Sequence, residues 1–177
     1  MPPTIAEPVT MLTDYLLAIA CVFFAASLVR RARAKGGRSL GLWVGAFLVT
    51  AFAALAGGSA HGFRPVLGEE LWTMLWSVTL WSIGLGSVLL IGAGVRSVLR
   101  SESSDEASRK LGIRNVKWAI AVSLVALAVL VGRLSLHEHF NKNDLYHAIQ
   151  LLGLYLLYRG ALLLHGLEAH SPRAKGS

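Results

Sequence analysis

Two long runs of the chain contain no charged residue, and they restrict its possible folds more than any other feature. Residues 39–60 and 71–95 are free of Asp, Glu, Lys and Arg. A helix needs roughly 20 mostly apolar residues to cross the hydrocarbon core of a bilayer. Helices of soluble proteins are usually shorter and keep one polar side. We therefore interpret both runs as transmembrane helices.

Three further stretches are apolar enough to be interpreted in the same way. The first carries Asp14 near its start, the fourth follows Lys117, and the fifth is interrupted only by Arg159. The sequence thus predicts an all-α polytopic membrane bundle, with residues 1–177 forming a single membrane domain. Its five transmembrane helices are expected at about 9–29, 39–60, 71–95, 117–136 and 145–166.

Lys and Arg residues are concentrated on one side of these predicted helices. Of the 17 in the chain, five lie in 30–38 and six in 96–117, which we predict to be a cytoplasmic loop. Because cytoplasmic loops are enriched in Lys and Arg, the N-terminus is expected outside and the C-terminus inside. Residues 1–10 carry no basic residue, so the first apolar segment is read as a retained anchor rather than a secretory signal. The expected location is the bacterial inner membrane, as a multi-pass protein.

This distribution also explains the formal net charge of +7. Most of the basic excess sets the topology, so we do not expect a nucleic-acid partner. The lipid bilayer is the expected partner, and the basic segment 30–38 could contact anionic headgroups. A membrane protein partner or a homo-oligomer is also compatible with the sequence.

Connection lengths and small residues predict which helices are neighbours. The second and third helices, and the fourth and fifth, are joined by short outer connections, so each pair should be antiparallel. Small residues near the end of the second helix and glycines in the third should mark close helix contacts. The glycines of the third helix are Gly84, Gly86, Gly92 and Gly94.

Polar side chains gather at the predicted outer boundary, although polar groups in a bilayer are costly. They are Asp14, His61, Glu69, Glu70, His137, His139, Asn143, Asp144 and His147. The subset Asp14, His61 and His147 is the best metal candidate, because imidazole and carboxylate suit zinc. Two alternatives remain open, a polar pocket without metal and scattered interface residues. In the latter case Asn143 or Asp144 would cap the fifth helix.

The fifth predicted helix carries a polar stripe along one face. At 100° per residue, His147, Gln150, Tyr158 and His165 fall close together. Such a stripe normally faces the bundle interior or an aqueous cavity. It could line a ligand pocket or a proton path, but interhelical hydrogen bonding is the default interpretation.

Three segments together resemble a family of bacterial integral membrane proteins without an assigned function. They are 7–15 (Glu-Pro, then Leu-Thr-Asp-Tyr), 57–62 (Gly-Gly-Ser-Ala-His-Gly) and 143–160 (Asn-Asp-Leu-Tyr-His-Ala-Ile-Gln to Tyr-Arg-Gly). The resemblance covers most of the chain and includes the same Asp14, His61 and His147. It implies no particular reaction.

The chain is also distantly similar to the membrane hydrolases that include alkaline ceramidases and adiponectin receptors. Those are seven-helix proteins that hold zinc with three histidines, together with an Asp and a Ser. The matching residue types here are Ser59, His61, His147 and either Asp14 or Asp144. The chain departs from that pattern in its five predicted spans and in the spacing of its Ser and His.

Three functions follow as hypotheses. The first is binding of a small ligand or a partner at an outward-facing His/Asp pocket. The second is a metal-dependent membrane hydrolase acting on a lipid-like substrate, with zinc held by Asp14, His61 and His147. The third is a b-type haem protein with His61 and His147 as axial ligands. The pocket candidates are Asp14, Ser59, His61, Glu70, Asp144, His147, Gln150 and Tyr158.

Overall fold

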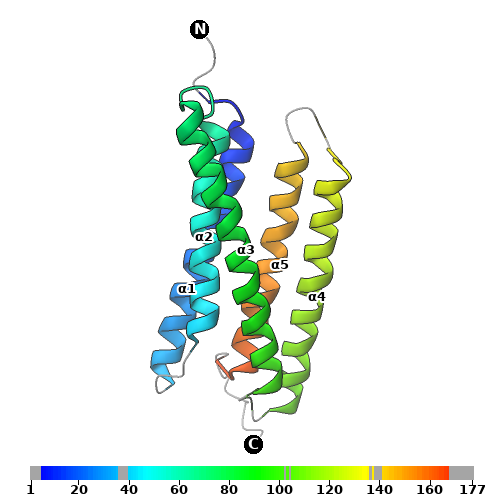
Figure 1. Cartoon of the computed structure of the whole chain (residues 1–177). Coiled ribbons are helices and arrows are strands. Elements are labelled where there is room, and N and C mark those ends of the chain that lie inside the picture. Colours follow the sequence, from blue (N-terminus) through cyan, green and yellow to red (C-terminus); the bar gives the residue numbers. More distant parts are fainter. Residues whose placement is uncertain are drawn as a thin grey trace, which may run out of the picture.

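The computed structural model describes residues 5–35, 40–101, 103, 105–135, 137 and 141–167, and this part of the chain is all-helical without a strand. Five long helices run side by side (Figure 1). They are α1 (Pro8–Ala34), α2 (Gly41–Gly62), α3 (Glu69–Leu99), α4 (Glu106–Val131) and α5 (Lys142–Leu164). The end of the bundle where α1 begins is drawn at the top of Figure 1, and we call it the upper end.

All five helices are long and apolar enough to cross a membrane, with best-window mean hydropathies between 1.3 and 2.1. Large apolar side chains cover their outer faces, including Trp81, which is 82% exposed, and Leu99, which is 78% exposed. Soluble monomers rarely expose contiguous apolar surfaces of this kind. The predicted all-α bundle with five apolar helices is therefore confirmed, and it fits a multi-pass membrane protein.

The boundaries of α4 differ most from the prediction. The helix covers Glu106–Val131 instead of 117–136, and α3 continues to Leu99, so the predicted loop 96–117 is largely helical. Asp105 starts α4 by accepting hydrogen bonds from the backbone N–H groups of Ala107 and Ser108. The charged residues of this first part include an i,i+3 pair, Glu106 with Arg109, which supports a helix. Charge content alone thus misplaced the start of the helix.

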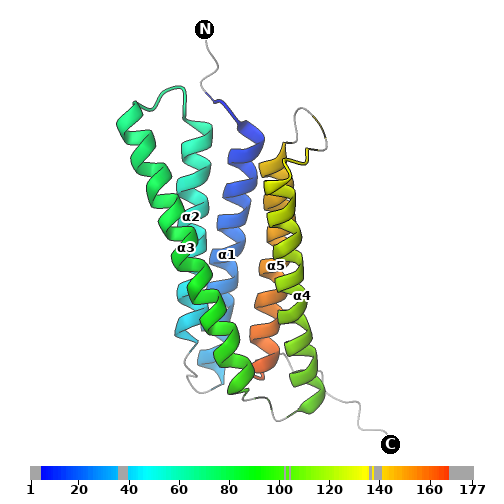
Figure 2. The same ribbon diagram turned by 45° about the vertical axis from the view of Figure 1, so that its right-hand side comes forward.

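The helices pack in a chain of neighbours. α1 packs against both α2 and α5, while α3 packs mainly on α2 and α4 on α5. Figure 2 shows α1 between α2 and α5. The two predicted antiparallel pairs, α2 with α3 and α4 with α5, are confirmed. As a result, α1, α2 and α5 are the more buried helices, and α3 and α4 are largely exposed.

Close packing depends on glycine at a position that was not predicted and at only some of those that were. A Cβ atom at Gly160 of α5 would lie 2.9 Å from Val116 Cγ2 of α4, so this contact requires glycine. In α3, Gly86 packs against Thr50 of α2, but Gly84 and Gly92 face open space. The prediction of close contacts was therefore wrong for those two glycines.

Candidate functional site at the upper end

A carboxylate and an imidazole meet between α1 and α5 at the upper end. Asp14 is only 4% exposed, although it lies in an apolar helix. Its Oδ1 atom is 3.3 Å from Nε2 of His147. Gly58 of α2 permits this arrangement, because a Cβ there would lie 2.8 Å from the Cβ of Asp14. The predicted partners Asp14 and His147 are thus brought together by three helices.

The second ring nitrogen of His147 is also occupied. Its Nδ1 lies 3.2 Å from Oγ1 of Thr13, and the Thr13 hydroxyl donates to the backbone carbonyl of Thr10 at 2.9 Å. A hydroxyl has a single proton to donate, so we assign Nδ1–H as the donor to Thr13. Nε2 then faces Asp14 either as N–H toward a carboxylate or as a lone pair toward a carboxylic acid. In both states the pair holds one proton between Asp14 and His147.

A second group of contacts joins the start of α5 to α1. The Thr10 hydroxyl is fully buried and lies 2.7 Å from Oδ1 of Asp144 and 3.2 Å from Oε2 of Glu7. The other oxygen of Asp144, Oδ2, accepts from the backbone N–H of Asn141 at 2.8 Å. Asn141 in turn caps α5, which completes a capping box. Asp144 therefore stabilises the start of α5, but the N-cap residue is Asn141 and neither Asn143 nor Asp144.

His61 lies beside Glu7, whereas the metal hypothesis placed it with Asp14 and His147. Its Nδ1 is 3.4 Å from Oε2 of Glu7. Its ring meets the ring of Trp76 edge to face, with centroids 5.3 Å apart. Trp72 stacks on Trp76, and the guanidinium of Arg64 sits 4.0 Å above Trp72. His61 and Glu7 thus form a rim between the aromatic side chains and the buried part of the cluster.

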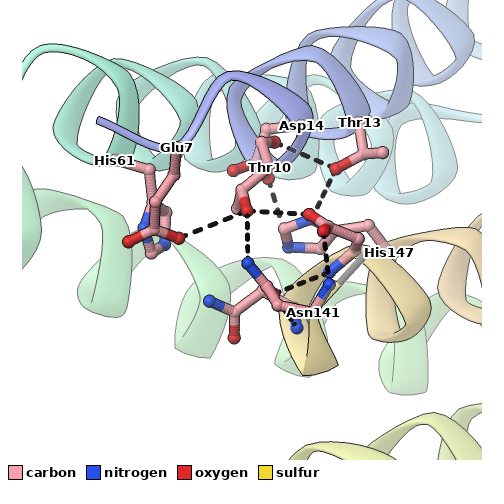
Figure 3. Close-up of polar contacts among 9 residues, drawn as sticks. Glu7, Thr10, Thr13, Asp14, His61, Asn141 and His147 are labelled. Carbon is pink, nitrogen blue, oxygen red and sulfur yellow. Dashed lines mark hydrogen bonds and ion pairs between the residues drawn. The ribbon is translucent and has the colours of Figure 1, made fainter. Parts of the chain in front are cut away.

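We call Glu7, Thr10, Thr13, Asp14, His61, Asn141, Asp144 and His147 the upper cluster. Figure 3 shows the α1 side chains of this cluster facing Asn141 and His147, with His61 beside Glu7. Glu7, Asp14 and Asp144 contribute three carboxyl groups to the cluster. Within the described residues, the ion-pair partners of Glu7 and Asp14 are histidines, without Lys or Arg. The upper cluster is therefore rich in carboxylate and lacks a permanent cation.

The remaining candidate residues lie outside this cluster. Ser59 is next to it and contacts the hydroxyl of Tyr15 at 3.1 Å. Glu70 is exposed at the start of α3, and Gln150 is half-buried on α5. Tyr158 lies toward the other end, 2.7 Å from the hydroxyl of Ser27. His139 lies outside the described residues.

The polar stripe of α5 makes interhelical contacts at three of its four positions. His147 and Tyr158 contact α1, and Nε2 of His165 is 3.0 Å from the Ser97 hydroxyl of α3. Interhelical bonding, the default interpretation of the stripe, accounts for these three. These three contacts can be explained without a ligand pocket or a proton path along the stripe.

Sequence reasoning missed Glu7, Thr10 and Thr13, although a usable signal was present. Glu7, Thr10 and Asp14 follow an i, i+3, i+7 spacing, which places them on one face of a helix. A carboxylate, a hydroxyl and a second carboxylate on one face of an apolar helix indicate a polar partner helix. Asn141 could have been found as an N-cap three residues before Asp144.

The metal hypothesis gains no support from this arrangement. Within the part of the chain that the structure describes, no three His, Cys, Asp or Glu side chains are placed to hold a metal ion. Both ring nitrogens of His147 already face protein partners, and His61 is directed toward Glu7. Zinc or haem coordination would need these side chains to rearrange.

Comparison with known proteins identifies one family. A model described as a family of unknown function (DUF6962) matches residues 9–113 and 106–165. The resemblance to an uncharacterised family is thereby supported, while the similarity to the membrane hydrolases finds no counterpart. No curated protein and no solved structure matches the chain.

Proposed function

The chain belongs to DUF6962, a family of unknown function, and from this premise we propose that it binds a small cationic ligand, such as a protonated amine, at the upper cluster. The observation that carries the proposal is the buried Asp14–His147 pair between apolar helices. In the proposed topology the upper end faces outward from a bacterial inner membrane.

The charges of the cluster favour a cation. The Asp14–His147 pair holds one proton and is neutral as a whole, so the uncompensated carboxylates are Glu7 and Asp144, and His61 is cationic only when protonated. Burying uncompensated negative charge is costly, so a bound cation would stabilise the cluster. Lys and Arg would supply permanent charge, but they do not pair with Glu7 or Asp14 in the described part of the chain.

The rim is the expected point of entry. The Glu7 side chain is 41% exposed and that of His61 is 18% exposed, whereas the Asp14 side chain is 6% exposed. Trp76 adds an aromatic surface beside His61, and aromatic faces attract ammonium groups. A protonated amine would contact Glu7 first, and the proton shared by Asp14 and His147 could then adjust to the added charge.

Hydrolysis is less well supported by the same contacts. Asp14, His147 and Thr13 form a chain of carboxylate, imidazole and hydroxyl, which resembles the order of groups in a nucleophilic triad. An activated nucleophile must give its proton to the imidazole. Here the Thr13 hydroxyl donates to the Thr10 carbonyl instead. We therefore prefer ligand binding over enzymatic hydrolysis.

Thermal unfolding of the protein in lipid nanodiscs tests the proposal. The probes are ammonium, methylamine, putrescine and spermidine, each titrated at constant ionic strength. At least one probe should raise the Tm saturably, because a ligand that binds only the folded state stabilises it by about 2.7 kcal/mol at 100 times its Kd. Glu7→Gln and Asp14→Asn should abolish the ligand-induced increase.

Glu70→Gln is the matched control, since it removes an exposed carboxylate at the same end but outside the cluster. It should retain the full increase. Comparing ligand-induced changes, rather than absolute Tm values, separates binding from any loss of stability in a variant. The proposal is wrong if no probe gives a saturable increase, or if Glu7→Gln and Asp14→Asn respond as Glu70→Gln does.

A further inference from the structure

An apolar groove lies between α1 and α2 in the half of the bundle away from the upper cluster. Its volume is about 480 Å³. Val22, Ala26 and Val29 of α1 form one wall, and Val44 and Leu48 of α2 form the other. Leu48 and Val22 are 47% and 48% exposed, so the groove opens on the outer surface of the bundle. In a membrane, this surface faces lipid.

Two arginines lie at one end of this groove. Arg30 and Arg33 belong to its lining and are exposed. Within the described residues neither makes an ion pair or a hydrogen bond. The neighbouring Arg31 differs, because its guanidinium group donates to the Ser27 hydroxyl and to the Leu167 carbonyl. The groove therefore combines an apolar wall with two guanidinium groups that have no protein partner in this part of the chain.

The length of the groove matches one leaflet. Val22, Ala26, Val29 and Arg33 follow one face of α1 with spacings of four, three and four residues. With a rise of 1.5 Å per residue, this stripe is about 16 Å long. Half the hydrocarbon core of a bilayer is about 15 Å thick. The arginines are thus positioned near the headgroups when the apolar stripe lies among the acyl chains.

We propose that this groove binds one anionic phospholipid of the adjacent leaflet. An acyl chain lies along the valine and alanine wall, and the phosphodiester is bound by Arg30 and Arg33. Guanidinium groups form strong charge-assisted hydrogen bonds with phosphate oxygens. The lining contains no carboxylate that would favour a zwitterionic or cationic headgroup. The inference is independent of the upper cluster, since no residue belongs to both sites.

Native mass spectrometry of protein released from nanodiscs tests this assignment. The nanodiscs contain equal amounts of phosphatidylglycerol and phosphatidylcholine, and the measurement is the ratio of the two lipids retained. Arg30→Gln/Arg33→Gln should lower the relative retention of phosphatidylglycerol about 25-fold, since each basic residue near an anionic membrane surface strengthens binding about fivefold. Arg100→Gln/Arg114→Gln, which removes the same charge at exposed positions outside the groove, should keep the wild-type ratio. Ala26→Trp fills the groove and should reduce retention of both lipids.

Leu48→Trp fills the groove from α2 and should give the same result as Ala26→Trp, which protects the test against one misfolded variant. Three results would overturn the proposal. The control pair could lose phosphatidylglycerol as strongly as the groove pair, which would indicate a general charge effect. Both tryptophan variants could retain the lipid at the wild-type level. The groove could instead hold a second copy of the chain, seen as a dimer that the tryptophan variants dissociate.

Discussion

The two ends of the bundle use different chemistry to hold α5 in place. At the upper end, α5 meets α1 through Asp14–His147 and Thr10–Asp144, and each of these contacts contains a carboxylate. Toward the lower end, Tyr158 bonds to a hydroxyl of α1, and His165 bonds to a hydroxyl of α3. One helix therefore carries both kinds of contact along a single stripe.

The different contacts at the two ends distinguish a role in helix packing from a role in ligand binding. The Ser27–Tyr158 contact joins two helices through hydroxyl groups, and the charge beside it is that of the Arg31 guanidinium, with no carboxylate among these contacts. Interhelical bonds of this type contribute only modestly to the stability of membrane proteins, by about 0.6 kcal/mol on average. The upper cluster holds carboxylates that are more costly to bury. A chain that needed only helix packing could use hydroxyl groups at both ends, so the acidic end is the better candidate for binding.

The largest effect is expected from breaking the buried pair. Asp14→Ala should lower the free energy of unfolding by about 3 kcal/mol, because it leaves His147 buried without its ionic partner. His147→Ala should have a similar effect. The double variant should lower the free energy of unfolding by clearly less than the sum of the two single effects. Unfolding of the protein in mixed micelles by a denaturing detergent measures all three. Additive effects would show that the two residues do not act as a pair.

The next effect concerns the start of α5. Asp144→Ala removes the Asp144 half of the capping box and the nearer of the two acceptors of the buried Thr10 hydroxyl, so it should lower the free energy of unfolding by about 2 kcal/mol. Hydrogen exchange of the first turn of α5 should become faster in the same variant. Glu70→Ala, at the start of α3, serves as the control and should leave both measurements unchanged. Equal effects of the two substitutions would contradict a specific role for Asp144.

At the lower end the expected effect is smaller. Tyr158→Phe removes only the hydroxyl that contacts Ser27, so it should lower the free energy of unfolding by about 0.6 kcal/mol. Ser27→Ala should cost about the same, and Arg31 would then lose one of its two acceptors. The comparison of the two ends fails if Tyr158→Phe destabilises the protein as much as Asp14→Ala does. The same detergent titration decides this.

The fold was more predictable from the sequence than the contacts within the site. Two uncharged runs and three further apolar stretches located five helices, because length and hydropathy are properties of each segment alone. The transmembrane helix was predicted to start at 117, and a short helical stretch at 105–111 was expected only within a cytoplasmic loop. The continuous α4 from Glu106 was missed, because its charged residues are typical of a loop until their capping and i,i+3 contacts are known. Asp14 and His147 were selected as costly polar residues in apolar segments, and the structure brings them within 3.3 Å of each other.

The pairing of those residues depends on helix rotation and approach, which the sequence does not specify directly. His61 was grouped with Asp14 because both lie at the same depth. In the structure it is turned toward Glu7 and the ring of Trp76. The depth of a residue in the membrane follows from counting residues along its helix. The direction of its side chain depends on contacts between helices, such as that of Gly58 with Asp14. The proximity of Asp14 and His147 was therefore predictable from depth, and the orientation of His61 was not.

The smallest effect is expected at Arg64, which lies at the exposed edge of the upper end and outside the upper cluster. Arg64 contacts the Trp72 ring and the Glu69 carboxylate, and its side chain is 41% exposed. Solvent screens such pairs, so Arg64→Ala should lower the free energy of unfolding by only about 0.5 kcal/mol. A double-mutant cycle with Asp14→Ala should show no coupling, since the two residues share no contact. A measurable coupling energy would extend the cluster to Arg64 and would place a permanent cation within reach of its carboxylates, which would weaken the case for a cationic ligand.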